Sequence, residues 1–149
     1  DLVISMFHVI NYMTKEKDLN SFFKVASSHL KTGGFLLFDT WYYPAVTHNK
    51  PKITKKIFKD RDFKIDRKAV PEKLNKQIYK IKYKINILNL KNLKNSCFSE
   101  THTIKVFKIG QLDNVSKNFN LKKINNFAFL KKTSPNKNNW GAVLIYQKL

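Results

Sequence analysis

The chain has 149 residues, of which 42% are hydrophobic and 26% charged, a composition typical of a folded domain rather than a disordered segment. Its 29 basic and 10 acidic residues give a formal charge of +19, which permits an anionic partner such as nucleic acid. One cysteine excludes an internal disulfide framework and a cysteine-based zinc site, and the scattered histidines predict no metal site. No apolar stretch is long enough to span a membrane and no signal peptide is recognisable, so we expect a soluble, cytoplasmic protein.

The first elements read as a strand, a helix and a second strand. Residues 1–7 show a buried strand pattern from the first residue onwards, so we expect the chain to be the C-terminal part of a longer protein. Thr14 is the expected N-cap of the helix, and Gly33 with Gly34 its left-handed stop. Residues 35–39 form an uninterrupted apolar run, as in parallel strands covered on both faces. The helix itself has one apolar stripe, at Leu19, Phe22, Phe23, Ala26 and Leu30.

The second part of the chain has a different pattern. Apolar residues there alternate with Lys, Asn or Thr, which predicts an antiparallel meander with one dry face and one wet face. The alternation covers residues 52–58, 63–70, 76–90 and 98–108. A short helix over 109–118 and strands over 121–130 and 140–147 are expected after it. We therefore divide the chain into a βαβ segment (1–50), a meander (51–108) and a C-terminal helix and hairpin (109–149).

The positive charge lies almost entirely outside the βαβ segment. Residues 1–49 contain four lysines and four acidic residues, so the rest of the chain carries the whole net charge. The basic residues are 27 Lys and only 2 Arg, whereas a nucleic-acid interface is expected to use more Arg for bidentate contacts. This bias favours a solvated surface encoded by an A/T-rich genome over a nucleic-acid interface.

The ordered elements resemble the C-terminal part of a class I S-adenosylmethionine-dependent methyltransferase. Four runs carry the resemblance, the first three of them to a bacterial small-molecule subgroup: SMFHVINY (5–12), FDTWYYPAV (38–46), ETHTIK (100–105) and HLKTGGF (29–35). The resemblance implies an α/β fold, namely part of a doubly wound Rossmann-like sheet with the antiparallel meander inserted as a substrate cap. It also implies S-adenosylmethionine as the cofactor and a small-molecule acceptor, a sugar-like one among the candidates.

Two departures from the family pattern matter. The family's Gly-rich cofactor loop is missing, since the only glycines are Gly33, Gly34, Gly110 and Gly141. We therefore expect residues 1–149 alone to bind the cofactor weakly or not at all, to be inactive, and to expose an aggregation-prone strand edge. Tyr43 also replaces a usual glycine, which predicts a different turn after the strand at 35–39.

Ligands of open α/β sheets lie outside the carboxyl ends of the strands, and this rule selects the candidate site. His8 is the candidate catalytic base or substrate ligand, with a packing histidine as the alternative. The resemblance places Phe7 and Met6 on the cofactor side, although Met6 also reads as strand core. Asp39 is expected to hydrogen-bond the substrate or to hold a loop amide.

Five more residues are candidates for the substrate side. Tyr12, Trp41 and Tyr42 are expected to wall an apolar pocket, or to fill the gap between sheet and meander. Glu100 and His102 lie two residues apart on one strand face, so they can reach a pocket together or form a polar pair on a solvated sheet. No metal ligands are predicted.

Three classes of function remain at this point. A small-molecule methyltransferase is favoured, with neither nucleic acid nor membrane as a partner. A nucleic-acid-binding protein or nucleic-acid methyltransferase is supported by the charge alone, and the (D/N/S)PP(Y/F) motif of N6-adenine enzymes is absent. A non-enzymatic basic meander is disfavoured by the βαβ unit that precedes it.

Overall fold

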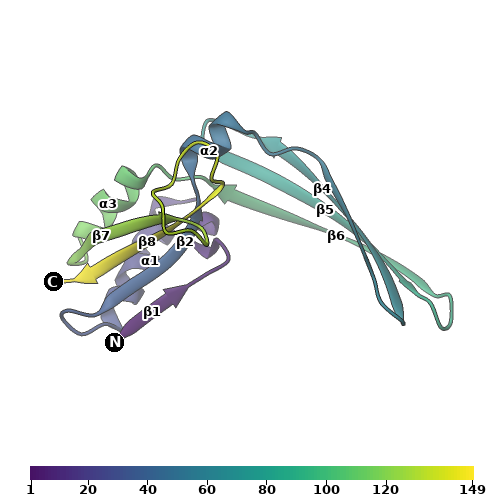
Figure 1. Ribbon diagram of the computed structural model, residues 1–149, viewed down its shortest axis with the longest axis horizontal. Helices are drawn as coiled ribbons and strands as arrows, with labels where there is room; N and C mark the ends of the chain where they lie inside the picture. Colours follow the sequence, from purple (N-terminus) through teal and green to yellow (C-terminus); the bar gives the residue numbers. More distant parts are fainter. The chain divides into compact units, whose positions relative to one another are not determined.

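The computed structural model describes all 149 residues, which divide into two compact units. Unit 1 comprises residues 1–50 and 104–149, and unit 2 comprises residues 51–103. Each unit is built on its own four-stranded sheet (Figure 1). None of the helices is long and apolar enough to cross a membrane.

The sheet of unit 1 combines a parallel pair with an antiparallel hairpin. Strands β1 (Leu2–Ser5) and β2 (Phe35–Trp41) pair in parallel and are joined by helix α1 (Glu16–Ser28), which confirms the predicted βαβ unit. Strand β8 (Gly141–Lys148) pairs with β2, and β7 (Leu121–Ala128) pairs with β8, both antiparallel. The resulting order is β1-β2-β8-β7.

Three shorter helical elements complete unit 1. The 3-10 helix η1 (Val9–Tyr12) follows β1, helix α2 (Tyr43–His48) follows β2, and helix α3 (Ile109–Lys117) precedes β7. The α3 helix was predicted, whereas α2 was not. Helix α2 begins at Tyr43, the position where the resembling family usually has glycine, with Pro44 in its first turn.

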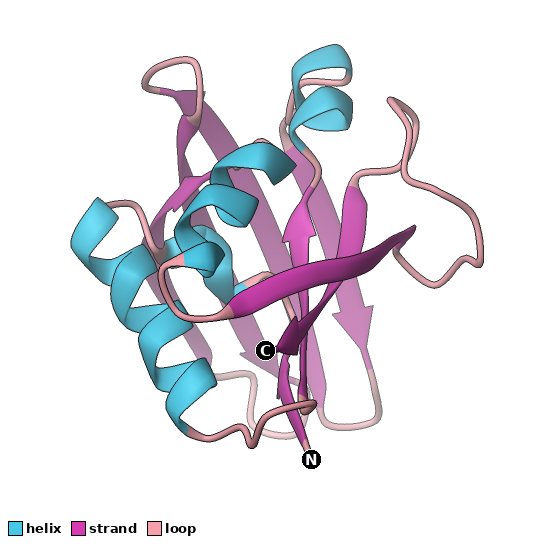
Figure 2. Cartoon of the chain, turned by 90° about the vertical axis from the view of Figure 1, so that its left-hand side faces the viewer, coloured by secondary structure: helices cyan, strands magenta, loops and turns pink.

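The helices α1 and α3 cover one face of this sheet and form the core with it (Figure 2). Phe38 of β2 stacks on Tyr146 of β8 at 5.5 Å between ring centroids, and Phe23 of α1 meets both rings edge-on. The predicted coverage of β2 on both faces is wrong for this chain. Leu2 and Phe35, which are register partners on the opposite face, are 53% and 38% exposed because both long helices lie on the same side.

Both ends of α1 differ from the prediction. The helix ends at Ser28 with His29 as its C-cap, whereas Gly33, whose φ of +84° is left-handed, lies in the following turn, which the Gly34 amide closes by donating to the Lys31 carbonyl. Thr14 is not the N-cap: that position is Lys15, without a side-chain cap. The reason is that η1 ends at Tyr12 and the Thr14 amide donates back to the Tyr12 carbonyl, which places Thr14 in a γ-turn before the helix.

Unit 2 is an antiparallel meander, as predicted. Its strands are β3 (Thr54–Lys59), β4 (Phe63–Lys73), β5 (Ile78–Asn89) and β6 (Asn95–Lys105), in the order β3-β4-β5-β6, with the last two residues of β6 in unit 1. The tight turns are closed by Asp60, Asn75 and Asn89, whose side-chain oxygens accept backbone N–H groups. The backbone N–H groups of Phe63 and Asp62 donate to Asp60 and lower the pKa of its carboxyl.

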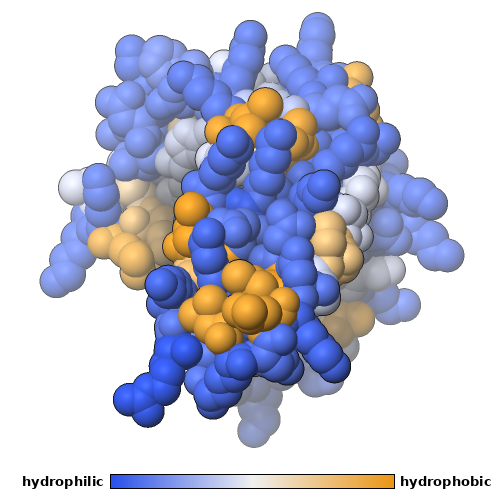
Figure 3. Space-filling view, turned by 90° about the vertical axis from the view of Figure 1, so that its right-hand side faces the viewer, coloured by the Kyte–Doolittle hydropathy of each residue, from blue (hydrophilic) through white to orange (hydrophobic).

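The expected dry face of the meander is only partly buried. Phe58, Phe63 and Phe98 are 51%, 40% and 44% exposed. Unit 2 is a single sheet with no helix of its own, so it has no second layer to cover the aromatic side chains. The end with the hairpin turns is mostly hydrophilic, with separate apolar patches (Figure 3).

Candidate functional site

The candidate site begins where β1 and β2 end side by side. After β1 the chain turns through Phe7 and His8, whose φ angles of 65° and 62° are left-handed and uncommon for residues with side chains. The turn brings the His8 backbone N–H to Asp39 Oδ1 at 2.8 Å. Asp39 therefore holds a loop amide, which is one of the two roles expected of it. Two consecutive strained residues at a strand end are typical of a functional site.

Asp39 also contacts the His8 side chain. His8 Nδ1 lies 2.8 Å from Asp39 Oδ2, an ion-pair distance, although the two groups are not aligned as a hydrogen bond. Asp39 is completely buried and His8 is one-third exposed. Burial raises the pKa of Asp39, but the ring and backbone N–H groups of His8, with its charge, outweigh it and hold the pKa below its usual value. The site thus contains a buried carboxylate whose partner is a partly exposed imidazole.

Aromatic rings surround this imidazole within unit 1. The His8 ring lies 6.3 Å from Trp41 and 6.1 Å from Phe129, and Trp41 lies 5.2 Å from Trp140, all between ring centroids. Gly141 makes the arrangement possible, because a Cβ there would come within 2.9 Å of Phe129 Cβ. Phe129, Trp140 and Gly141 were not identified from the sequence; the Trp-Gly pair opening the last strand was the available signal.

Asn11 is a second residue that sequence reasoning missed. It is buried, its Oδ1 accepts the Trp41 backbone N–H at 3.0 Å and the Thr40 hydroxyl at 3.3 Å, and its Nδ2 donates to the Lys105 carbonyl at 2.7 Å. It therefore ties η1 to the end of β2 and to the segment leading into α3. Its signal was a lone amide in the otherwise apolar run of residues 9–13.

The other predicted site residues of unit 1 differ in their exposure to solvent. Phe7 is 85% exposed, Tyr12 is 46% exposed, and Met6 is half-buried. Tyr42 is half-buried and packs against the core of unit 1.

Glu100 and His102 belong to unit 2. His102 Nε2 lies 3.2 Å from Glu100 Oε2, and the His102 ring meets Tyr83 edge-on at 5.1 Å. The structure thus brings His8, Asp39 and Trp41 together in one unit, and Glu100 and His102 together in the other.

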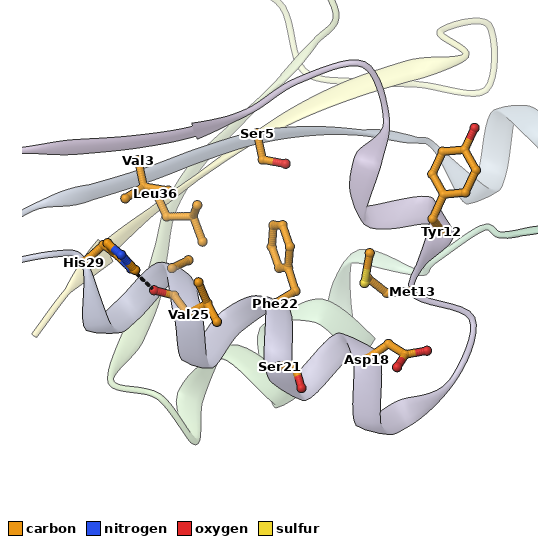
Figure 4. A pocket seen from close by; sticks show the side chains of 11 residues that line it. Val3, Ser5, Tyr12, Met13, Asp18, Ser21, Phe22, Val25, His29 and Leu36 are labelled. Carbon is orange, nitrogen blue, oxygen red and sulfur yellow. Dashed lines mark hydrogen bonds between the residues drawn. The ribbon is translucent and has the colours of Figure 1, made fainter.

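A cavity of unit 1 lies apart from His8. It has a volume of about 570 Å³ and lies between β1, η1 and α1, with Val3, Phe22 and Leu36 among its mostly apolar lining (Figure 4). His29, at the end of α1, also lines it and contacts the Val25 carbonyl through Nδ1 at 2.9 Å. The cavity borders β1, which pairs with no strand other than β2.

Comparison with known proteins gives a result for the fold. No protein-family model and no curated protein matches the sequence. Solved structures do match: an S-adenosylmethionine-dependent methyltransferase from Clostridium acetobutylicum superposes with a TM-score of 0.79 at 18% identity, over 99% of this chain and 58% of that one. The chain has the fold of part of an S-adenosylmethionine-dependent methyltransferase.

Two further matches are methyltransferases whose acceptors are named. An amino pentose methyltransferase from Micromonospora echinaspora gives a TM-score of 0.75 at 12% identity, over 99% of this chain and 58% of that one. A sugar N-methyltransferase from a Streptoalloteichus species gives 0.76 at 11% identity, over 99% and 55%. This chain thus spans somewhat more than half the length of the methyltransferases that it matches.

Proposed function

We propose that this chain is the acceptor-side, C-terminal part of an S-adenosylmethionine-dependent methyltransferase that acts on a small molecule carrying an amino sugar or a similar group. The observation that carries the proposal is the fold match over 99% of the chain, with the His8–Asp39 pair at the strand ends where ligands of such sheets bind. The named acceptors of the two sugar-related matches support a small-molecule acceptor.

The proposed role of His8 is to accept a proton from the acceptor. Methyl transfer is an in-line displacement that depends mainly on positioning, and an acceptor that is a hydroxyl or an ammonium must also lose a proton. Because His8 Nδ1 faces Asp39, Nε2 is the nitrogen left for the acceptor. The buried Asp39 carboxylate stabilises the imidazolium that results. Trp41 and Phe129 both contact the His8 ring and restrict the orientation of its imidazole.

The residues of this chain fit the cofactor only in part. S-adenosylmethionine supplies the methyl group when bound, and we propose that Phe7 and Met6, at the end of β1, face it. Phe7 is free to pack against a ligand because it is 85% exposed. None of the four glycines lies in the turn between β1 and α1, so no stretch of flexible backbone is available there for close approach to a cofactor.

The two tryptophans of the chain allow a direct test. Both belong to the candidate site, so the whole tryptophan fluorescence of residues 1–149 reports on it. Titration with amino sugars is expected to change this fluorescence saturably, and His8→Ala to weaken the response at least fivefold. His48→Ala, at the end of α2, is the matched control and should leave the response unchanged.

Calorimetry is expected to detect no micromolar binding of S-adenosylmethionine by the same chain.

The nucleic-acid alternative is tested by retention of residues 1–149 on DNA at increasing salt. A log–log slope corresponding to several released counterions, with no fluorescence response to any sugar, would contradict the proposed function and favour that alternative.

A further inference from the structure

A row of three lysines crosses the sheet of unit 2. Lys55 of β3 pairs with Lys68 of β4, and Lys68 pairs with Lys84 of β5, so the three residues lie directly opposite one another. Register partners point to the same face, with Cβ atoms roughly 5 Å apart, and like charges placed in this way destabilise a sheet. All three side chains are exposed, so their ammonium groups are available to solutes. We call these three residues the lysine row.

None of the acidic residues of unit 2 forms an ion pair with the lysine row. Residues 51–103 contain 15 basic and 5 acidic residues. Asp60 accepts turn amides. The other four acidic residues pair with bases outside the row: Asp62 with Lys91, Asp66 with Lys64, Glu72 with Lys82 and Glu100 with His102. The lysine row therefore has no ion-pair partner within the unit.

A cavity of about 300 Å³ lies at the lysine row. The three lysines line it together with Asn86, whose amide can donate a hydrogen bond, and with Asp66, which is 3.8 Å from Lys64. This volume lies at the lower end of the range of small-molecule sites. The row spans two inter-strand spacings, or roughly 10 Å, which is wider than one phosphate group needs.

We propose that the lysine row binds a small linear polyanion of the pyrophosphate or triphosphate class. Such a ligand places successive negative charges along the row and replaces the like-charge repulsion by charge-assisted hydrogen bonds. Free inorganic phosphate chains and organic diphosphates both carry such charges and make the same contacts with the row. This site belongs to unit 2 and does not depend on the proposed methyl transfer.

The test is calorimetric titration of residues 1–149 with inorganic pyrophosphate, with orthophosphate as the comparison and adenosine diphosphate as an organic diphosphate. Pyrophosphate is expected to bind at least tenfold more tightly than orthophosphate. Lys68→Gln, at the centre of the row, should weaken pyrophosphate binding about tenfold. Lys76→Gln makes the same charge change in an exposed turn of unit 2 and should weaken it less than twofold. Tighter binding of adenosine diphosphate than of pyrophosphate would identify an organic diphosphate as the ligand, and weaker binding an inorganic one.

A second measurement separates lost binding from lost folding. Removing one ammonium from the row relieves repulsion, so Lys68→Gln should raise the melting temperature of the ligand-free protein by about 1–3 °C while it weakens pyrophosphate binding. Equal effects of Lys68→Gln and Lys76→Gln would overturn the proposal. So would equal affinity for orthophosphate and pyrophosphate, or a Lys68-dependent binding of DNA tighter than that of pyrophosphate.

Discussion

At the scale of single residues, the site depends on a buried charge that was only half recognised in the sequence. Asp39 stood out because an acid ends an apolar strand, and His8 because it follows one. The sequence could not show that the two meet, because the meeting depends on the left-handed turn at Phe7 and His8, and a phenylalanine does not favour that conformation.

The contacts of Asp39 with His8 predict an acid-dependent stability. The pKa of Asp39 is lowered in the folded protein, so its contribution is fully present above the unfolded-state value of about 3.9 and is lost as the pH falls through the folded-state value. Asp39→Asn should therefore reduce the free energy of unfolding by about 1–3 kcal/mol at pH 7 and by much less below pH 3. Urea unfolding between pH 2.5 and 7 measures the difference, and a loss of equal size at every pH would contradict the assignment.

The close approach of Phe129 to the last strand predicts a requirement for glycine at 141. An added Cβ would meet Phe129 Cβ at 2.9 Å, so Phe129, whose ring contacts His8, must shift. Gly141→Ala is expected to destabilise the protein by about 1–3 kcal/mol. Gly110→Ala is the control, because nothing lies within 4 Å of a Cβ there and α3 gains a better helix former. Thermal unfolding should order the variants as Gly110→Ala, wild type, Gly141→Ala, from most to least stable.

At the scale of elements, periodicity predicted the strands and helices well but not the short connections. Period-two alternation located β4 and β5, and the stripe at i, i+3, i+4 located α1. The 3-10 helix η1 and the six-residue α2 are too short to show a period. The side chain of Asn11 ties η1 to β2, and Tyr42, the residue before α2, donates its backbone N–H to the Trp140 carbonyl.

Asn11 is accordingly expected to contribute strongly to stability. Asn11→Ala leaves the Trp41 N–H and the Lys105 carbonyl without their partner, and we expect a loss of about 2–4 kcal/mol from two unsatisfied groups. Asn20→Ala removes one exposed side-chain contact on α1, with the Glu16 carbonyl, and should cost less than about 0.5 kcal/mol. Chemical denaturation of both variants tests the assignment, and similar losses would show that Asn11 is not a specific tie between elements.

At the scale of the whole molecule, the resemblance in sequence indicated the fold, but composition alone misled in one respect. A hydrophobic fraction of 42% indicated a folded domain but not that the sheet of unit 1 is covered by helices on one face only. The aromatic cluster around His8 could not be predicted, because Trp41 and Phe129 are far apart in sequence and both reach His8 only through the pairing of β2 with β8 and of β8 with β7. The structure also shows where part of the +19 charge lies, namely in a row of lysines without ion-pair partners that crosses three strands of unit 2.

The uncovered face of unit 1 predicts self-association of residues 1–149. Leu2 and Ile4 of β1 are 53% and 58% exposed, and the outer edge of β1 pairs with no strand of this chain. Exposed apolar edges of this kind are templates for pairing between molecules. Ile4→Lys should therefore shift size-exclusion elution towards the monomer and lower the binding of a hydrophobic dye, with a change of less than about 1 kcal/mol in the free energy of unfolding because Ile4 is already largely exposed. Leu93→Lys adds the same charge at a residue that is 74% exposed, in the turn between β5 and β6. An equal reduction of self-association by both variants would mean that net charge, and not the edge of β1, controls association.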